Sequence, residues 1–421
     1  MKRPILLVLT LFIVQIILCI YGNRIFQKEA NPFAIMAITA AFAYYCFQIL
    51  SNQPHQERSK SKSYLPWVYV FIAMAGLFTA YEEVRKLWVK YPDPSKISDV
   101  LPQLNALCVR FFTGEYPYAP VKLPTHEPFP IYMPLHWAPI QISYALGIDI
   151  RWSAMLILIV AVGIAAYFLS KAHINTSPTQ TIAATLLFAL PIWAYVIWAP
   201  IELSVSLEGI VAAWYILLAT GLATKNLYLI TIGIIGGVLS RYTLLFWLPL
   251  FAILLWLNAP RKYSYWVWGL TLSAFTLLFV LPFWMKDPEL VSKVFSYYHV
   301  GIERTWLHPD EYTFLDGLSL NIHLRHWLPG NPEDNLKYCN YPQIIFQLIL
   351  SGLGIYFYQK RWKDKIDIYS FSLIALAIMP LYFYNLSPML FKYYMLMPLS
   401  VSAVLCWKTI ACVNIESGNR F

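Results

Sequence analysis

Charged residues are scarce in this sequence. They make up 13% of its 421 residues, whereas hydrophobic residues make up 59%, and soluble domains carry roughly 25% charged residues. This composition excludes a water-soluble domain and a disordered chain. Six cysteines are too few for a disulfide scaffold of this length. Phosphate-cradling glycine loops, His-Glu-x-x-His and Cys-x-x-Cys motifs are also absent from the sequence, so no motif indicates a nucleotide-binding or zinc enzyme.

Long apolar stretches are what the sequence does contain. A membrane-spanning helix needs about 20 mostly apolar residues. Twelve stretches reach or approach that length: 5–22, 32–50, 65–81, 152–170, 181–199, 207–223, 226–240, 242–258, 265–285, 343–359, 367–384 and 394–412. The first lacks the small-residue cleavage site of a signal peptide, so we interpret it as an uncleaved anchor. We predict an all-α polytopic membrane protein with about 12 transmembrane helices, forming one domain over residues 1–421.

The distribution of Lys and Arg predicts an orientation. Basic residues near span ends accumulate on the cytoplasmic side, and here they are concentrated in segments 51–64, 259–264 and 360–366. With twelve crossings, these segments lie on the same side as both termini. We therefore expect a multi-pass protein of a bacterial inner or plasma membrane, with cytoplasmic N- and C-termini. The formal net charge of +9 then reflects this asymmetry and implies no nucleic-acid partner.

Two long polar segments, 82–151 and 286–342, fall on the predicted outer side. They hold most of the acidic residues and most of the histidines, so we expect any chemistry on the outer face. Cys108 and Cys339 lie one in each segment, where an oxidising compartment would allow a disulfide. We favour two unpaired thiols.

The first polar segment predicts a short helix on the membrane surface. Ser98 and Asp99 are favourable N-cap residues, and apolar residues recur with helical spacing over 100–112. Gly114 suits the position after a helix end. A second amphipathic piece is expected at about 135–148. Asp99 then stands at a helix N-terminus facing the outer leaflet, where its carboxylate either does chemistry or only caps the helix.

The order of several residues in this segment resembles a known pattern. Asp99, Gly114, Pro117-Tyr118 and Tyr132-x-Pro134-Leu135 resemble the first loop of membrane glycosyltransferases of the GT-C superfamily. The similarity is closest to the bacterial α-mannosyltransferase branch that uses polyprenol-phosphate sugars. Met133 replaces the first of two prolines in that pattern.

Two later pieces extend the resemblance to about residues 98–250. Residues 233–250 resemble the glycine-rich helix of the family, with Arg241 as the basic residue. Residues 204–208 match a family element only in position and polarity. Two extra spans before the first loop depart from the usual plan.

The resemblance implies a GT-C-like fold and an inverting glycosyltransferase. Its donor would be a sugar on a polyprenyl phosphate in the membrane, and its acceptor a hydroxyl of a glycolipid or surface glycan. Asp99 would take the acceptor proton, with Asp93 as an alternative. The phosphate ligands would be Arg241, Lys392 and Arg325, because cationic groups stabilise the leaving phosphate. The other candidate substrate-binding residues are Glu208, Glu202, Tyr118, Tyr132 and His136. No cofactor is certain, and a divalent metal is optional because no diphosphate is released.

Two other classes stay open. A surface-polysaccharide polymerase or ligase would also act on lipid-linked sugars and would use Arg and His residues of 286–342, such as Arg304 and Arg325. A lipid or solute transporter would need polar groups at mid-membrane, where Gln15, Gln48 and Gln347 stand isolated. Glu82 and Glu83, each followed three residues later by a basic residue, are expected to form surface ion pairs.

Overall fold

The fold is helical throughout the part of the chain that the structure describes. The computed structural model describes residues 3–26, 30–52, 66–92, 98–123, 126–172, 178–307, 319–388 and 391–413, and within them it contains helices and no strand. Seven helical runs are long and apolar enough to cross a membrane: α1 (Arg3–Ile25), α2 (Ala30–Ser51), α3 (Pro66–Lys90), α7 (Arg151–Ala172), α14 (Arg261–Phe275) with η4 (Thr276–Trp284), α19 (Ile368–Asn385), and η9 (Lys392–Met395) with α20 (Leu396–Val413). This is the character of a polytopic membrane protein.

Shorter helices complete the bundle and its connections. Between the long helices lie α8 (Pro178–Leu186), α9 (Ala189–Trp198), α10 (Pro200–Ser204), α11 (Glu208–Thr224), α12 (Leu227–Val238), η3 (Tyr242–Phe246), α13 (Leu248–Asn258), and α18 (Tyr341–Phe357) with η8 (Tyr358–Trp362). The two polar segments contain α4 (Val100–Phe112), α5 (Pro134–Trp137), η2 (Ala138–Ile140), α6 (Gln141–Ala145), α15 (Leu290–Leu307), α16 (Leu320–Trp327), α17 (Pro332–Asn335) and η7 (Leu336–Tyr338).

The prediction of an all-helical membrane protein is confirmed. Seven of the twelve predicted stretches coincide with the long helices. The stretch 181–199 is divided between α8 and α9, and the other four form α-helices of 17 residues or fewer. The number of twelve crossings therefore stays a prediction.

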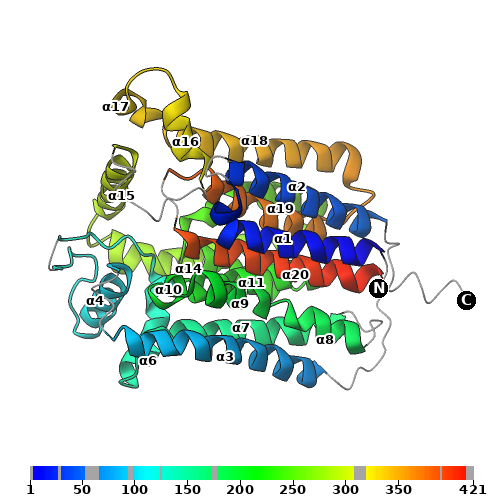
Figure 1. Ribbon diagram of the computed structural model, residues 1–421, viewed down its shortest axis with the longest axis horizontal. Coiled ribbons are helices and arrows are strands. Elements are labelled where there is room, and N and C mark those ends of the chain that lie inside the picture. Colours follow the sequence, from blue (N-terminus) through cyan, green and yellow to red (C-terminus); the bar gives the residue numbers. More distant parts are fainter. Residues whose placement is uncertain are drawn as a thin grey trace, which may run out of the picture.

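The helices of the bundle run side by side, and the helices of the polar segments gather at one end of it. Figure 1 shows α4 and α15 lying across this end, whereas α1 begins and α20 ends at the opposite end. We call the first the loop end and the second the terminal end. Both polar segments of the sequence thus lie on one side of the bundle, away from the termini.

The centre of the bundle is α11. Nearly all of its residues are buried, and it packs against α7, α12, α19 and α20. Glycines permit the closest of these contacts. A Cβ added at Gly233 of α12 would lie 2.4 Å from the backbone nitrogen of Leu218 in α11. This close packing holds the ends of α11 and α12 in a defined position at the loop end.

The first polar segment follows the sequence prediction closely. α4 covers Val100–Phe112 as expected, and Gly114 has the left-handed φ of +78° that ends the helix. The second amphipathic piece is divided among α5, η2 and α6. α3, in contrast, continues to Lys90, so residues 82–90 are helical rather than loop.

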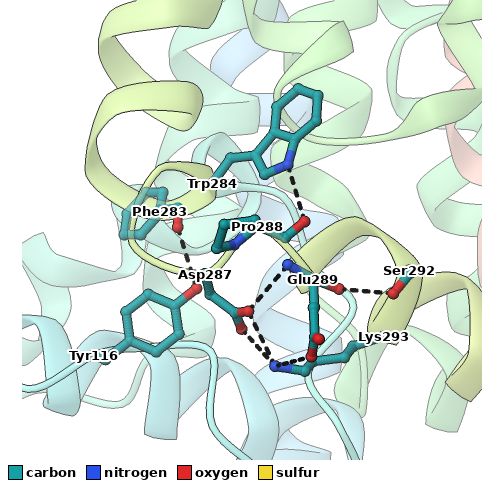
Figure 2. Close-up of polar contacts among 8 residues, drawn as sticks. All are labelled: Tyr116, Phe283, Trp284, Asp287, Pro288, Glu289, Ser292 and Lys293. Atoms are coloured by element: carbon teal, nitrogen blue, oxygen red, sulfur yellow. Dashed lines mark hydrogen bonds and ion pairs between the residues drawn. The ribbon is translucent and has the colours of Figure 1, made fainter.

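A polar corner joins α14–η4 to α15 and touches the first segment (Figure 2). Nζ of Lys293 lies 3.0 Å from both carboxylate oxygens of Asp287. Nε1 of Trp284 donates to the carbonyl of Pro288 at 3.2 Å, and the hydroxyl of Tyr116 donates to the carbonyl of Phe283 at 3.4 Å. These bonds turn the chain so that α15 crosses the end of the bundle.

The two cysteines of the polar segments are not joined. Cys108 and Cys339 are free and buried, and they belong to separate hydrophobic clusters. Burial raises the pKa of each thiol to about 11. Both therefore stay protonated and act as small apolar residues.

Candidate functional site

A buried ion pair between Arg241 and Glu208 forms the centre of the site. Glu208 is the first residue of α11, and Arg241 stands in extended backbone between α12 and η3. A terminal nitrogen of Arg241 contacts Oε1 of Glu208 directly, and the exposed fractions of the two side chains are 9% and 1%. Nε of Arg241 and Oε2 of Glu208 have no hydrogen-bond partner in the part of the chain described. The pair therefore keeps one free donor and one free acceptor.

Tyrosine rings surround the guanidinium group. Its central carbon lies 4.3 Å from the ring centroid of Tyr394, which is a cation–π contact. Tyr384 stacks on Tyr394 with a centroid distance of 5.2 Å. Tyr132 and Tyr393 also lie within electrostatic range of Arg241. The rings come from the first polar segment, α19 and η9, and they shield the cation from solvent.

Two hydrogen bonds to the backbone of Leu135 fix the position of α5 near the ion pair. The N–H of Leu135 donates to the carbonyl of Leu239 at 2.7 Å, and Nε1 of Trp214 donates to the carbonyl of Leu135 at 3.2 Å. The next residue, His136, is thereby held close to Arg241. The bond from Leu135 to Leu239 thus brings the first polar segment next to the end of α12.

His136 brings two further polar atoms without partners to the site. Its side chain is 1% exposed, and neither ring nitrogen has a hydrogen-bond partner among the described residues. Burial, together with the positive charge of Arg241, holds the pKa of His136 well below its usual value. The imidazole is therefore neutral at physiological pH and offers one donor and one acceptor.

Asp99 lies at the solvent side of the same cluster. Its carboxylate accepts from Nε2 of Gln103 at 2.9 Å and lies 3.6 Å from Nε2 of His126. The Asp99 side chain makes no capping hydrogen bond to α4; the N–H of Val100 donates to Oγ of Ser98 instead. The interpretation of Asp99 as a simple cap is therefore wrong. Its carboxylate is 39% exposed and accessible from solvent.

Tyr132 connects Asp99 with Arg241. Burial raises the pKa of Tyr132 well above its usual value, the charge of Asp99 raises it further, and Arg241 opposes this rise. Tyr297 of α15 also lies within range of Asp99, because that carboxylate adds to the effect of burial in raising the pKa of Tyr297. Asp99, the expected base, and Arg241, the expected phosphate ligand, thus both influence the pKa of Tyr132.

Lys392 and Glu202 form a second charged region next to the first. Burial raises the pKa of Glu202, whereas Lys392 and the backbone N–H of Tyr393 lower it in part. The carbonyl of Lys392 accepts from the hydroxyl of Tyr195 at 2.5 Å, which fixes the start of η9. Tyr393 lies within range of both Glu202 and Arg241, so the two charged regions are continuous.

Of three other predicted residues, the structure describes the side chain of one, Tyr118. Tyr118 is buried; its hydroxyl donates to the carbonyl of Tyr132 and accepts from Nε1 of Trp137, so it supports the site rather than facing a ligand. Arg325 belongs to α16, but its side chain lies outside the described residues, and Asp93 lies outside them altogether.

The expected surface ion pairs of α3 are present. Arg85 pairs with Glu82 at 2.9 Å and Lys86 pairs with Glu83 at 2.6 Å. The prediction for this cluster is therefore confirmed, and these acids are not part of the site.

Tyr393 and Tyr394 were not among the site residues predicted from the sequence. Their contact with Arg241 was missed, because aromatic residues occur at every membrane interface. The signal that could have found it is the run Phe391-Lys-Tyr-Tyr394, in which a cation and three rings enter a span together.

Comparisons with known proteins leave the family open. No protein-family model matches the chain, and neither a curated protein nor a solved structure is significantly similar to it. Within the described residues, no three His, Cys, Asp or Glu side chains converge as a metal site would require.

The arrangement can bind an anion beside a hydroxyl group. A shielded guanidinium with a free N–H suits an oxyanion such as a phosphate. His136 and Glu208 offer hydrogen bonds to polar groups next to it. Asp99 supplies an accessible carboxylate at the edge, where a proton can leave to solvent.

Proposed function

We propose that the chain is a GT-C-type glycosyltransferase that moves a sugar from a polyprenyl-phosphate donor to a hydroxyl of a lipid-linked or surface glycan. The observation that carries the proposal is the cluster of Arg241, Tyr132 and Asp99, with unpartnered buried polar atoms around the cation. Such atoms are costly to leave unsatisfied. A ligand with a phosphate and several hydroxyl groups would satisfy them.

Each step of the reaction has a candidate residue. The acceptor oxygen attacks the anomeric carbon while the bond from that carbon to the phosphate oxygen breaks, so the anomeric configuration inverts. Asp99 takes the proton of the acceptor hydroxyl. Arg241 holds the phosphate and stabilises the charge that it gains with the bonding electron pair, and Lys392 adds a second positive charge.

The topology supports a donor held in the membrane. We propose that the twelve apolar stretches cross the membrane, with the loop end on the outer face. The site then lies at the level of the outer headgroups, where a polyprenyl phosphate presents its phosphate.

The glutamines in the spans favour an enzyme over a transporter. Nε2 of Gln15 donates to Oγ1 of Thr39 at 3.0 Å, and Nε2 of Gln347 donates to the carbonyl of Met379 at 3.0 Å. Each bond joins two neighbouring helices. The amide nitrogens of these two side chains therefore serve helix packing.

The test is mass spectrometry of lipid-linked sugars and surface glycans in cells that lack the chain, carry it, or carry Asp99→Asn at equal membrane abundance. We expect both defective strains to lose one sugar and to accumulate the glycosylated carrier lipid. Glu115→Gln is the matched control, because Glu115 is an exposed acid of the same segment. Full glycan in the Asp99→Asn strain would refute the assigned base. Uptake of a solute without any covalent product would favour the transporter.

A further inference from the structure

The carboxylate of Glu208 occupies the place at Arg241 that a phosphate would take. Both side chains are almost completely buried, and Glu208 is the one carboxylate in contact with Arg241 among the described residues. The pair is neutral as it stands. A phosphate monoester has a second pKa of about 6 and is a dianion above neutral pH. Its arrival would leave two uncompensated negative charges in a buried site.

Among the described residues, the nearest further cation is Lys392, and its charge already acts on Glu202, whose pKa it lowers. The titratable groups that face Arg241 are His136 of α5, Tyr132, Tyr298 of α15, Tyr384 of α19, and Tyr393 and Tyr394 of η9. Tyr242 is adjacent in the chain, and Tyr81 of α3 lies beside Gly209. The phenols and the imidazole are neutral at physiological pH. Asp99, on the far side of Tyr132, is itself negative.

We infer that Glu208 is a proton-coupled counter-ion: it takes up one proton when a phosphate monoester binds at Arg241 and releases it when the phosphate leaves. This inference rests on the proposed function, in which Arg241 holds the phosphate. The donor is a phosphodiester with one negative charge, and the monoester is the polyprenyl phosphate that remains after sugar transfer. The proton moves from solvent to a carboxylate oxygen of Glu208, and no covalent bond changes in the binding step. The physical reason is that a buried carboxylate without its cation, next to a second anion, is more stable protonated.

The coupling gives Glu208 two functions. In the empty site it neutralises Arg241, so that a buried cation is not left alone. In the occupied site its protonated form donates a hydrogen bond instead of repelling the phosphate. Loss of that proton after sugar transfer favours release of the polyprenyl phosphate product.

The experiment is isothermal titration calorimetry of the full chain in detergent with farnesyl phosphate as the probe, in two buffers of different ionisation enthalpy. At pH 8 we expect about one proton taken up per phosphate bound, and between pH 7 and 9 the Kd should rise about tenfold per pH unit. Glu208→Gln should abolish the uptake and make the Kd independent of pH. Glu208→Asp keeps a carboxylate and should keep the uptake, which preserves the test if the glutamine variant does not fold.

Two controls separate the possible failures. Arg241→Gln should abolish binding, and Glu289→Gln, an exposed acid on the same end of the bundle, should behave as the wild type. Binding that requires Arg241 but takes up no proton would overturn the inference about Glu208 and leave the proposed function standing. Equal uptake in Glu208→Gln would also overturn it, because the proton would then be on the phosphate. Absence of any binding to the wild type would contradict the phosphate site and, with it, the proposed function.

Discussion

The central carbon of the Arg241 guanidinium lies 4.3 Å from the ring centroid of Tyr394, while a terminal nitrogen of the same group contacts Glu208. A ring and a carboxylate therefore both contact the cation. Tyr394 itself stacks on Tyr384, so three side chains fix the direction of the guanidinium. This leaves Nε as the unpartnered donor.

We expect the ring of Tyr394 to contribute more to phosphate binding than its hydroxyl, which accepts a hydrogen bond from Arg241. Tyr394→Phe keeps the cation–π contact and should change farnesyl phosphate affinity by less than about threefold, whereas Tyr394→Leu removes about 1–2 kcal/mol and should weaken binding roughly five- to thirtyfold. The measurement is the Kd at fixed pH and salt. Equal weakening by both substitutions would show that the hydroxyl is the important group.

We expect mild acidification to destabilise the folded state through His136. Burial and Arg241 lower its pKa in the folded state, so the unfolded chain binds more protons below its ordinary pKa of about 6.5. The contribution of neutral His136 to the free energy of unfolding should therefore be fully present above that pH and decrease as the pH falls below it. Thermal unfolding in detergent between pH 8 and 5 measures this effect.

The control for this prediction is His136→Gln, which should flatten the dependence in that range. His299→Gln changes an exposed histidine of α15 and should leave it unaltered. An unchanged acid sensitivity in His136→Gln would assign the effect to another group.

We expect a second pH dependence of stability, which arises from Asp367 at the terminal end. Burial alone would raise its pKa, but Lys408, Lys225 and hydrogen bonds from Ser370 lower it to about 2. A carboxyl with a lowered pKa stabilises the fold above its unfolded pKa of about 3.9 and loses this contribution as the pH falls towards 2. Asp367→Asn should thus cost about 2 kcal/mol at pH 5.

The matched control for Asp367 is Asp364→Asn, an exposed acid in the same turn. Chemical denaturation at pH 5 and pH 2.5 provides the comparison. The cost of Asp367→Asn should shrink at the lower pH, and a cost that does not change with pH would exclude the ion pairs as its source.

Close packing of α11 and α12 predicts opposite results for two glycines. Gly233→Ala would place a Cβ 2.4 Å from the Leu218 backbone, whereas a Cβ at Gly269 of α14 meets no atom within 4 Å. Gly233→Ala should destabilise the fold by about 1–3 kcal/mol. Gly269→Ala should leave it unchanged or stabilise it by up to about 1 kcal/mol, because alanine favours helix. Midpoints of thermal unfolding measure both, and equal midpoints would contradict this packing.

The sequence by itself determined the class of the protein and the local structure of its first polar segment. Apolar stretches of span length and few charges predict membrane helices, because backbone groups in lipid must be bonded within the segment. Ser98 and Gly114 delimit α4 correctly, because capping depends on residues within one helical turn. These are local effects, so a sequence pattern suffices to predict them.

Only the tertiary structure decided which polar residues meet. Glu208 and Arg241 were predicted as separate ligands, and their pairing follows from the close packing of α11 against α12. Tyr394 of η9 contacts Arg241 just before the start of η3, and His136 is brought near Arg241 by the bond from Leu135 to Leu239. Contacts between the ends of different helices depend on packing of the whole bundle, and no spacing within one segment encodes them.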